Sequence, residues 1–271
     1  MTHPAEPSAL SDQGHLRDAN QALVLAVMRA QDASDAARCE HTRQADMLYR
    51  LAHELRAPLA PLRTVVSLLG HQHGAEHLPN VQRVIERQVT HLAQMVEDLL
   101  DAARMRTGKL SLRMVATDLL DVLTTSVQGC SSSVEQRGQT LDVDVPEQRV
   151  AIHADPVRLT QVFTNLLSNA SKYTPRGGHI ALSVSLLHDQ MWVSVSDNGI
   201  GITPQAIDSV FDAYMQEPHA VRHDDSGLGL GLTLARELVL AHGGSIRVHS
   251  AGLNCGTRFD VVLPLAGAAD A

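Results

Sequence analysis

Hydrophobic residues recur every three, four or seven positions in two stretches between about residues 16 and 102, a spacing that predicts long amphipathic helices. The first helix is expected from about Leu16 to Leu69, with one stripe of buried residues that consists of Leu48, Leu51, Leu55, Leu59, Leu62, Val66 and Leu69. After a break at 70–77, a second stripe repeats at seven-residue intervals through Leu78, Ile85, Leu92 and Leu99. One antiparallel hairpin cannot cover stripes this long on both helices. We therefore expect two hairpins to form a four-helix bundle in a homodimer.

From about residue 110 the pattern changes to short alternating segments between helices. Helices are predicted at 117–136, 155–172 and 231–242. Strands are predicted at 141–145, 150–154, 180–187, 191–196, 245–250 and 257–263. Helices beside a mainly antiparallel or mixed sheet predict a two-layer α/β sandwich. The expected fold class is thus α + α/β, a helical-hairpin dimerisation domain followed by an α/β domain.

The change of pattern at Thr107-Gly108-Lys109 also predicts how the chain divides into segments. Residues before the joint are expected to belong to helices, and residues after it to the α/β sandwich. We expect a disordered leader at 1–14, an N-terminal helix or weak coiled coil at 15–40, a dimerisation hairpin at 41–107, a linker at 108–112 and an α/β domain at 113–267.

Composition narrows the range of functions. The chain has 22 basic and 30 acidic residues, a net charge of −8, which disfavours a general nucleic-acid binder because such a protein needs a basic face. The longest apolar run, 22–28, is far shorter than the roughly 20 residues of a membrane helix. The three cysteines form no CxxC pair, which favours a reducing compartment. We expect a cytoplasmic protein without a secretion signal, a membrane span or a nucleic-acid partner.

The first cluster that can carry chemistry is His53-Glu54, on the first predicted helix. At 100° per residue His53 lies off the stripe of buried leucines, so its ring should face solvent as part of an exposed His–Glu pair. Pro58 lacks an N–H and clashes with the carbonyl of Glu54, and this predicts a kink that Pro61 extends. A surface histidine is by itself an ordinary solvated residue, so this cluster depends on the others.

The second cluster lies on the predicted helix 155–172. Asn165, Asn169 and Lys172 recur at intervals of four and three, so they share one helix face. Amide oxygens are neutral ligands for Mg²⁺, and a lysine ammonium pairs with phosphate oxygens. The alternative is an ordinary polar helix surface.

Two glycine-containing turns make up the third and fourth clusters. Asp197 ends a predicted strand, where its carboxylate can accept a hydrogen bond from a purine amine, and Gly199 and Gly201 follow it. Further on, three alternating glycines precede a helix, so free N–H groups and the positive helix end can face a phosphate chain. This loop consists of Gly227, Leu228, Gly229, Leu230 and Gly231. The polar segment before it, from Tyr214 to Asp225, is expected to form a mobile lid.

In this order and at these spacings, the four clusters resemble those of the sensor histidine kinases of two-component signalling. His53 to Leu59 is similar to the H box, Asn165 to Lys172 to the N box, Asp197 to Gly201 to the G1 box, Phe211 to the F box and Gly227 to Gly231 to the G2 box. The resemblance covers about residues 40–265. It implies a dimerisation and histidine-phosphotransfer domain followed by an ATP-binding domain of the gyrase/chaperone/kinase type.

The resemblance also implies a role for each matching residue. His53 would accept the phosphoryl group and Glu54 would act as its base and orienting partner. Asn169, with Asn165, would hold Mg²⁺, Lys172 would neutralise phosphate charge, and Tyr173 would line the nucleotide pocket. Asp197 would read adenine beside Gly199 and Gly201. ATP would be bound further by Gly227, Leu228, Gly229, Leu230 and Gly231. The expected partners are a response-regulator receiver domain and an upstream sensor or signalling protein.

Two positions separate this chain from its relatives. Related ATPases carry a water-activating glutamate where Asn165 stands, and an amide cannot act as a base, so ATP should survive until a histidine arrives. Ala57 stands where many relatives have a Thr or Asn that positions water, which predicts weak phosphatase activity. Two alternatives stay open: a dimeric scaffold that does little catalysis, and an ATPase of the superfamily.

Overall fold

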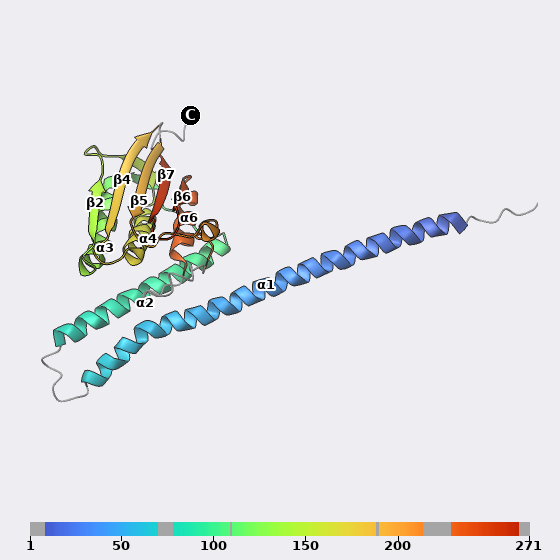
Figure 1. Cartoon of the computed structure of the whole chain (residues 1–271), viewed down its shortest axis with the longest axis horizontal. Coiled ribbons are helices and arrows are strands. Elements are labelled where there is room, and N and C mark those ends of the chain that lie inside the picture. Colours follow the sequence, from blue (N-terminus) through green and yellow to red (C-terminus); the bar gives the residue numbers. More distant parts are fainter. Residues whose placement is uncertain (1–8, 70–77, 109, 188–189, 214–228, 266–271) are drawn as a thin grey trace, which may run out of the picture. The chain divides into compact units, whose positions relative to one another are not determined.

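The computed structural model describes residues 9–69, 78–108, 110–187, 190–213 and 229–265 (Figure 1). The chain forms two units, 1–53 and 54–271, and the division falls within the first helix. The break at 70–77 and the lid at 214–225, both predicted from the sequence, lie outside the described residues.

Two long helices begin the described chain. Helix α1 spans Ala9–Leu69 and helix α2 spans Leu78–Arg106. The α-helix of α1 starts earlier than the predicted Leu16, and it continues through Pro58 and Pro61. The disturbance expected at these prolines therefore does not end the helix.

The remaining elements are a mixture of helices and strands, as predicted for the second part of the chain. They are β1 (Val115–Asp118), α3 (Leu119–Gln136), β2 (Thr140–Asp144), β3 (Ala151–Ala154), α4 (Pro156–Tyr173), β4 (His179–Leu187), β5 (Gln190–Asp197), α5 (Pro204–Ile207), α6 (Gly231–Ala241), β6 (Ser245–His249) and β7 (Thr257–Pro264).

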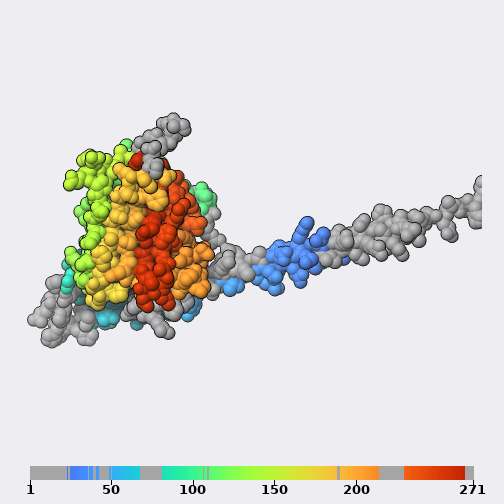
Figure 2. Space-filling view, turned by 45° about the horizontal axis from the view of Figure 1, so that its top comes forward, coloured from blue at the N-terminus to red at the C-terminus, as the bar shows by residue number. Residues whose placement is uncertain are grey.

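Five of the strands form one mixed sheet in the order β2-β4-β5-β7-β6. Only the β2–β4 pair is parallel, and the other neighbours are antiparallel. Helices α3, α4 and α6 cover one face of this sheet (Figure 1). Figure 2 shows strands β4, β5 and β7, coloured yellow to red, uncovered on the other face. The two-layer α/β sandwich predicted from the sequence is confirmed.

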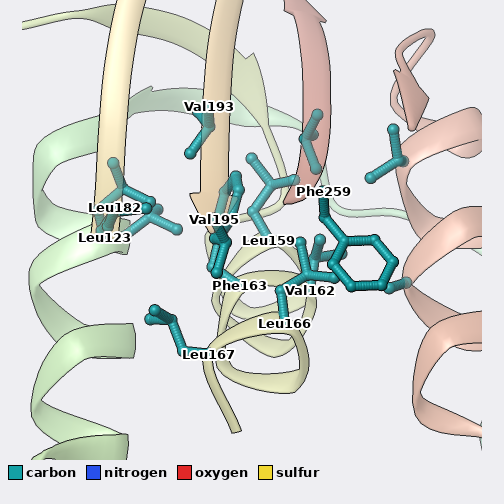
Figure 3. Close-up of a cluster of buried hydrophobic side chains, with 14 of the residues drawn as sticks. Leu123, Leu159, Val162, Phe163, Leu166, Leu167, Leu182, Val193, Val195 and Phe259 are labelled. Atoms are coloured by element: carbon teal, nitrogen blue, oxygen red, sulfur yellow. The ribbon is translucent and has the colours of Figure 1, made fainter. Parts of the chain in front are cut away.

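The core lies between the sheet and the three helices. Leu159, Val162, Phe163 and Leu166 of α4 are fully buried, and they point among the inward side chains of β4 and β5 (Figure 3). Every second residue of strand β5 from Met191 to Val195 is buried, as expected for a strand with one covered face. The buried residues Met191, Val193 and Val195 face the helices. Each large apolar side chain of this kind stabilises the fold by about 1.5–3 kcal/mol. The buried side of α4 thereby fixes where its polar side lies.

Strand β1 and helix α5 were not predicted from the sequence. The helix expected at 117–136 starts only at Leu119, because the Asp118 side chain accepts a hydrogen bond from the Leu120 N–H and caps it. The preceding four residues pair instead with β3 as a separate two-stranded sheet. Four residues of mixed polarity carry too little periodicity to indicate a strand, so the pairing depends on the tertiary fold.

Candidate functional site

Helix α4 carries the second cluster on the side opposite the core. Its first turn is capped by Asp155, whose carboxylate accepts hydrogen bonds from the N–H groups of Val157 and Arg158. Asn165, Asn169 and Lys172 are half-buried, whereas the residues on the other side of the helix are in the core. The prediction that the three polar residues share one face is confirmed.

The two asparagines differ in what they contact. The Asn165 amide donates a hydrogen bond from Nδ2 to the backbone oxygen of Gly231, at 3.2 Å, and so joins α4 to the start of α6. Within the described part of the chain, the half-buried amide of Asn169 has no hydrogen-bond partner. Its oxygen and the Oδ1 of Asn165 are the kind of neutral ligand that Mg²⁺ accepts, so these residues fit a cation bound with phosphates.

Lys172 lies in the last turn of α4. Its Nζ lies 5.1 Å from the centroid of the Tyr173 ring. Burial lowers the pKa of Lys172, the Glu54 carboxylate acts to raise it, and the Arg137 guanidinium acts to lower it. A partly desolvated ammonium interacts more strongly with an anion than one in bulk water. Lys172 is therefore suited to neutralise phosphate oxygens.

Asp197 ends β5 beside α4. Its Oδ1 accepts a hydrogen bond from the Gly199 N–H at 2.8 Å. Burial raises the pKa of the Asp197 carboxyl, and hydrogen bonds from the backbone N–H groups of Gly199 and Thr257 oppose this effect. Each carboxylate oxygen has two lone pairs, so a partly buried carboxylate can accept a further hydrogen bond from a ligand amine.

The turn after Asp197 is held from two directions. The Ile200 N–H donates to the Tyr173 carbonyl at 3.1 Å, and the Gly256 N–H donates to the Gly199 carbonyl at 3.1 Å. Gly201 has φ +68°, and a Cβ there would lie 2.1 Å from the Gly252 oxygen. Glycine is required at this position because both the backbone conformation and the space exclude a side chain. The turn therefore joins the end of α4 to the loop before β7.

The fourth cluster is described only in part. Gly229 has φ +65°, Leu230 is buried, and Gly231 begins α6. No side chain of the described residues caps this helix, and uncapped N–H groups at the start of a helix can bind an anion. Gly227 and Leu228 lie outside the described residues, as does Tyr214. Nearby, the Phe211 ring makes an edge contact with Phe259 at 6.2 Å between centroids.

The structure separates the two members of the first cluster by their exposure. His53 is exposed on α1, as predicted. The expectation of an exposed Glu54 is wrong: this residue is only 7% exposed, and its buried Oε2 has no hydrogen-bond partner among the described residues. Helical periodicity cannot reveal this difference, because other parts of the fold bury Glu54. A buried carboxylate without a donor can accept a proton or a hydrogen bond from a group that approaches it.

Sequence reasoning missed residues that hold these clusters in place. One is His242, whose Nε2 accepts the Asp155 N–H at 3.0 Å while its Nδ1 lies 2.7 Å from the Leu238 oxygen. Another is Gly256, with φ +71°, where a Cβ would lie 2.0 Å from the backbone oxygen of Asp197. The two glycines of the 252–256 loop could have indicated Gly256 from the sequence. His242 is identified only by its tertiary contacts.

Two family models match the chain. The "His Kinase A (phospho-acceptor) domain" matches residues 43–108, and the "Histidine kinase-, DNA gyrase B-, and HSP90-like ATPase" matches residues 154–267. The first range includes His53, and the second includes the residues on α4, the Asp197 turn and the start of α6. None of the described helices combines the length and hydropathy needed to cross a bilayer.

Similar proteins agree with these matches. The signal transduction histidine-protein kinase/phosphatase MprB of Mycolicibacterium paratuberculosis is 35% identical over 233 residues, 82% of this chain and 43% of that protein. The adaptive-response sensory kinase SasA of a Synechococcus species is 32% identical over 230 residues, 81% of this chain and 59% of that protein. The chain thus spans less than two thirds of either relative. A crystal structure of full-length ShkA in complex with AMPPNP is 29% identical, with a TM-score of 0.60 over 80% of this chain and 45% of that one.

Proposed function

This chain belongs to the sensor histidine kinases of two-component signalling and carries their transmitter core, and we propose that it transfers the γ-phosphoryl group of ATP to His53. One observation carries the proposal. Helix α4 connects the three nucleotide clusters, because it bears Asn169 and Lys172, bonds to the Asp197 turn through Tyr173, and bonds to Gly231 through Asn165. These contacts support a single site for ATP.

In this proposal each cluster binds one part of ATP. Asp197 accepts a hydrogen bond from the adenine amine, and Tyr173 lines the pocket. Lys172 and the loop of Gly227, Leu228, Gly229, Leu230 and Gly231 neutralise and cradle the phosphates. Asn169 and Asn165 hold Mg²⁺, which supplies charge neutralisation on the phosphate oxygens when bound. The amide of Asn165 cannot activate water as a carboxylate would, which favours transfer to a histidine over hydrolysis.

The transfer itself needs a neutral imidazole. A ring nitrogen of His53 forms a bond to the γ-phosphorus, the bond from that phosphorus to the β,γ-bridging oxygen breaks, and ADP leaves with the electron pair. Glu54 orients the ring and takes up the proton of the attacking imidazole. The Oε2 of Glu54, which is buried and has no hydrogen-bond partner among the described residues, supports this role because it has a lone pair available to a ring N–H.

Exposed apolar residues on the hairpin support a homodimer. Leu59 and Val66 of α1 are 47% and 70% exposed, and Val89 and Val96 of α2 are 53% and 48% exposed. Each pair is spaced by seven residues, so each helix presents an apolar stripe that a second hairpin would bury. The proposed domain boundaries are those predicted from the sequence, except that helix α1 begins at Ala9, inside the disordered leader expected at 1–14. Localisation in the cytoplasm stays a prediction.

The phosphoryl group would pass from His53 to an aspartate of a response-regulator receiver domain, and an upstream sensor or signalling protein would control the reaction. Ala57 has a methyl side chain one helical turn after His53, where it can neither donate nor accept a hydrogen bond. We therefore expect weak phosphatase activity toward the regulator.

Labelling with γ-phosphate-labelled ATP and Mg²⁺ tests the proposal directly. The wild-type chain should acquire an acid-labile, base-stable label, and His53→Gln and Asn169→Ala should not. His91→Gln serves as the matched control, because His91 is also exposed on the hairpin and should label normally. Label on the His53→Gln variant would contradict the proposal, because another residue would then be the acceptor. Hydrolysis of ATP without labelling of the wild type would contradict it and favour an ATPase. Binding of ATP with neither reaction would favour a scaffold.

A further inference from the structure

The last turn of α4 ends in a set of carbonyls that a helix cannot satisfy by itself. Each of them has a specific donor here. The Ala170 oxygen accepts from the Thr174 N–H and the Tyr173 oxygen from the Ile200 N–H, both at 3.1 Å. The other two accept from side chains, and these side chains come from the turn between α3 and β2.

Gln139 supplies the first of these side chains. Its Nε2 donates to the Ser171 oxygen at 2.9 Å and to the Thr174 oxygen at 2.7 Å. Its Oε1 accepts from the Ser171 hydroxyl at 2.8 Å. Gln139 is 7% exposed, and Ser171 is fully buried. The amide therefore uses both its hydrogens and its oxygen inside the protein, where unpaired groups are costly.

Arg137 supplies the second side chain. Backbone hydrogen bonds also hold the turn between α3 and β2 to the segment that follows α4. The Arg137 Nη1 donates to the Lys172 oxygen at 3.3 Å, while its own carbonyl accepts from the Gly177 N–H at 3.1 Å. The Thr140 N–H donates to the Gly178 oxygen at 3.0 Å, where the parallel pairing of β2 and β4 begins. Because the turn is bonded to the segment after α4, its side chains hold the helix end in one position.

We propose that Gln139 is a positioning residue for the nucleotide site, acting through the last turn of α4. This turn carries Lys172 and the Tyr173 carbonyl that holds the Asp197 turn, and Asn169 lies immediately before it. Among the described residues, the Gln139 side chain makes no hydrogen bond to a side chain assigned to ATP, and its effect is on their placement. The inference rests on the proposed function, because it assumes that this site takes ATP.

Removal of the Gln139 side-chain amide tests whether this residue positions the end of α4 or only contributes to stability. Gln139→Leu keeps a buried side chain of similar size and leaves the Ser171 and Thr174 carbonyls without their donor. The helix end should then move or fray, and the hydrogen bond from Ile200 to Tyr173 should open more often. Gln136→Leu is the matched control, because Gln136 is exposed three residues earlier and its amide donates to the Ser132 hydroxyl within α3.

The experiment uses the full chain at a temperature where each variant is folded, which thermal unfolding establishes. Titration with ATP and excess Mg²⁺ gives the dissociation constant, and hydrogen exchange gives the protection of the Ile200 amide. Gln139→Leu should bind about tenfold or more weakly than wild type and lose protection at Ile200, while Gln136→Leu matches wild type in both. A folded Gln139→Leu with wild-type affinity and wild-type protection would overturn the proposal.

A milder variant covers the case in which Gln139→Leu does not fold. Ser171→Ala removes only the hydroxyl that orients the Gln139 amide, and it should shift affinity and protection in the same direction by less. If Ser171→Ala changes neither while Gln139→Leu is unfolded, the positioning role is also overturned. If the folded wild type binds no ATP, the proposed function is contradicted. Protection of the Ile200 amide in the variants then still tests whether Gln139 holds the end of α4.

Discussion

The Asp101 carboxylate of α2, none of which is exposed, accepts a hydrogen bond from the Arg158 guanidinium of α4. The same oxygen accepts from the Gln161 amide at 3.1 Å, and Arg104 lies 3.6 Å from the other oxygen. Burial also raises the pKa of the neighbouring Asp98. The end of the helical hairpin is therefore joined to the nucleotide-binding helix by a buried charge cluster.

Loss of one partner from this cluster should be costly. Arg158→Met removes the guanidinium that bonds to the buried Asp101 carboxylate but leaves the Gln161 amide and Arg104 beside it, so the free energy of unfolding should fall by about 1.5–3 kcal/mol. Urea unfolding measures the change. Arg149→Met is the control: the Arg149 side chain is 88% exposed beside Asp118, and loss of an exposed pair costs at most about 1 kcal/mol. Equal effects of the two variants would contradict the prediction.

The Asp197 carboxyl should affect stability in a pH-dependent way. Burial raises the folded-state pKa above the ordinary 3.8, so the contribution of this group is fully present at low pH and is lost as the pH rises through the folded-state pKa. Asp197→Asn cannot ionise. Its free energy of unfolding relative to wild type should therefore improve as the pH rises from about 4 to about 7, measured by urea unfolding. A difference that stays constant or falls would contradict this.

The same variant should weaken nucleotide binding. A hydrogen bond to a charged group contributes about 1.5–3 kcal/mol, so Asp197→Asn should raise the dissociation constant for ATP about tenfold or more near neutral pH. Titration calorimetry measures the constant, and Asp212→Asn, at an exposed aspartate, provides the control. Equal affinity in the two variants would remove Asp197 from the adenine site.

The charge of Glu54 should influence the pKa of Lys172. Burial lowers the pKa of Lys172, and the Glu54 carboxylate acts against this effect. Glu54→Gln should therefore lower the pKa of Lys172 further, as measured by NMR of the lysine side chains. The chain has only one other lysine, Lys109, so Lys109→Arg assigns the signal. Glu86→Gln on the exposed side of α2 is the control, and an equal shift in both variants would contradict the prediction.

The turn glycines should be far less tolerant than a helical glycine. Gly201→Ala places a Cβ 2.1 Å from the Gly252 oxygen at φ +68°, so it should abolish ATP binding or destabilise the fold by more than about 1 kcal/mol. Gly129→Ala in α3 meets no atom closer than 3.9 Å and should stabilise the protein by about 0.5–1 kcal/mol. Thermal unfolding compares them, and tolerance of alanine at Gly201 would contradict the turn geometry.

The apolar stripes of the hairpin predict the outcome of a charge substitution. Val66→Glu and Val96→Glu place carboxylates where a second hairpin would pack, so the mass from light scattering should fall from twice 29.2 kDa toward 29.2 kDa. Thr90→Glu, at an exposed polar position of α2, should leave the mass unchanged. A wild type that is monomeric at the start would contradict the homodimer.

The sequence by itself determined the elements with strong local signals. The apolar stripes indicated the long helices, the alternation of β5 indicated a half-buried strand, and the spacing of Asn165, Asn169 and Lys172 placed them on one helix face. These features depend on periodicity and on backbone chemistry, which act between residues close in the chain. The family resemblance added the identity of the site, because its motifs are local as well.

Only the tertiary structure decided which distant residues meet. It buried Glu54, paired the four residues of β1 with β3, and capped α4 with Arg137 and Gln139 from another element. It also joined Asp101 to Arg158, 57 positions apart. Such contacts form because buried polar groups are stable only when they are hydrogen-bonded, and their partners are the groups that core packing places beside them. These partners are distant in the sequence, so no short-range pattern predicts them.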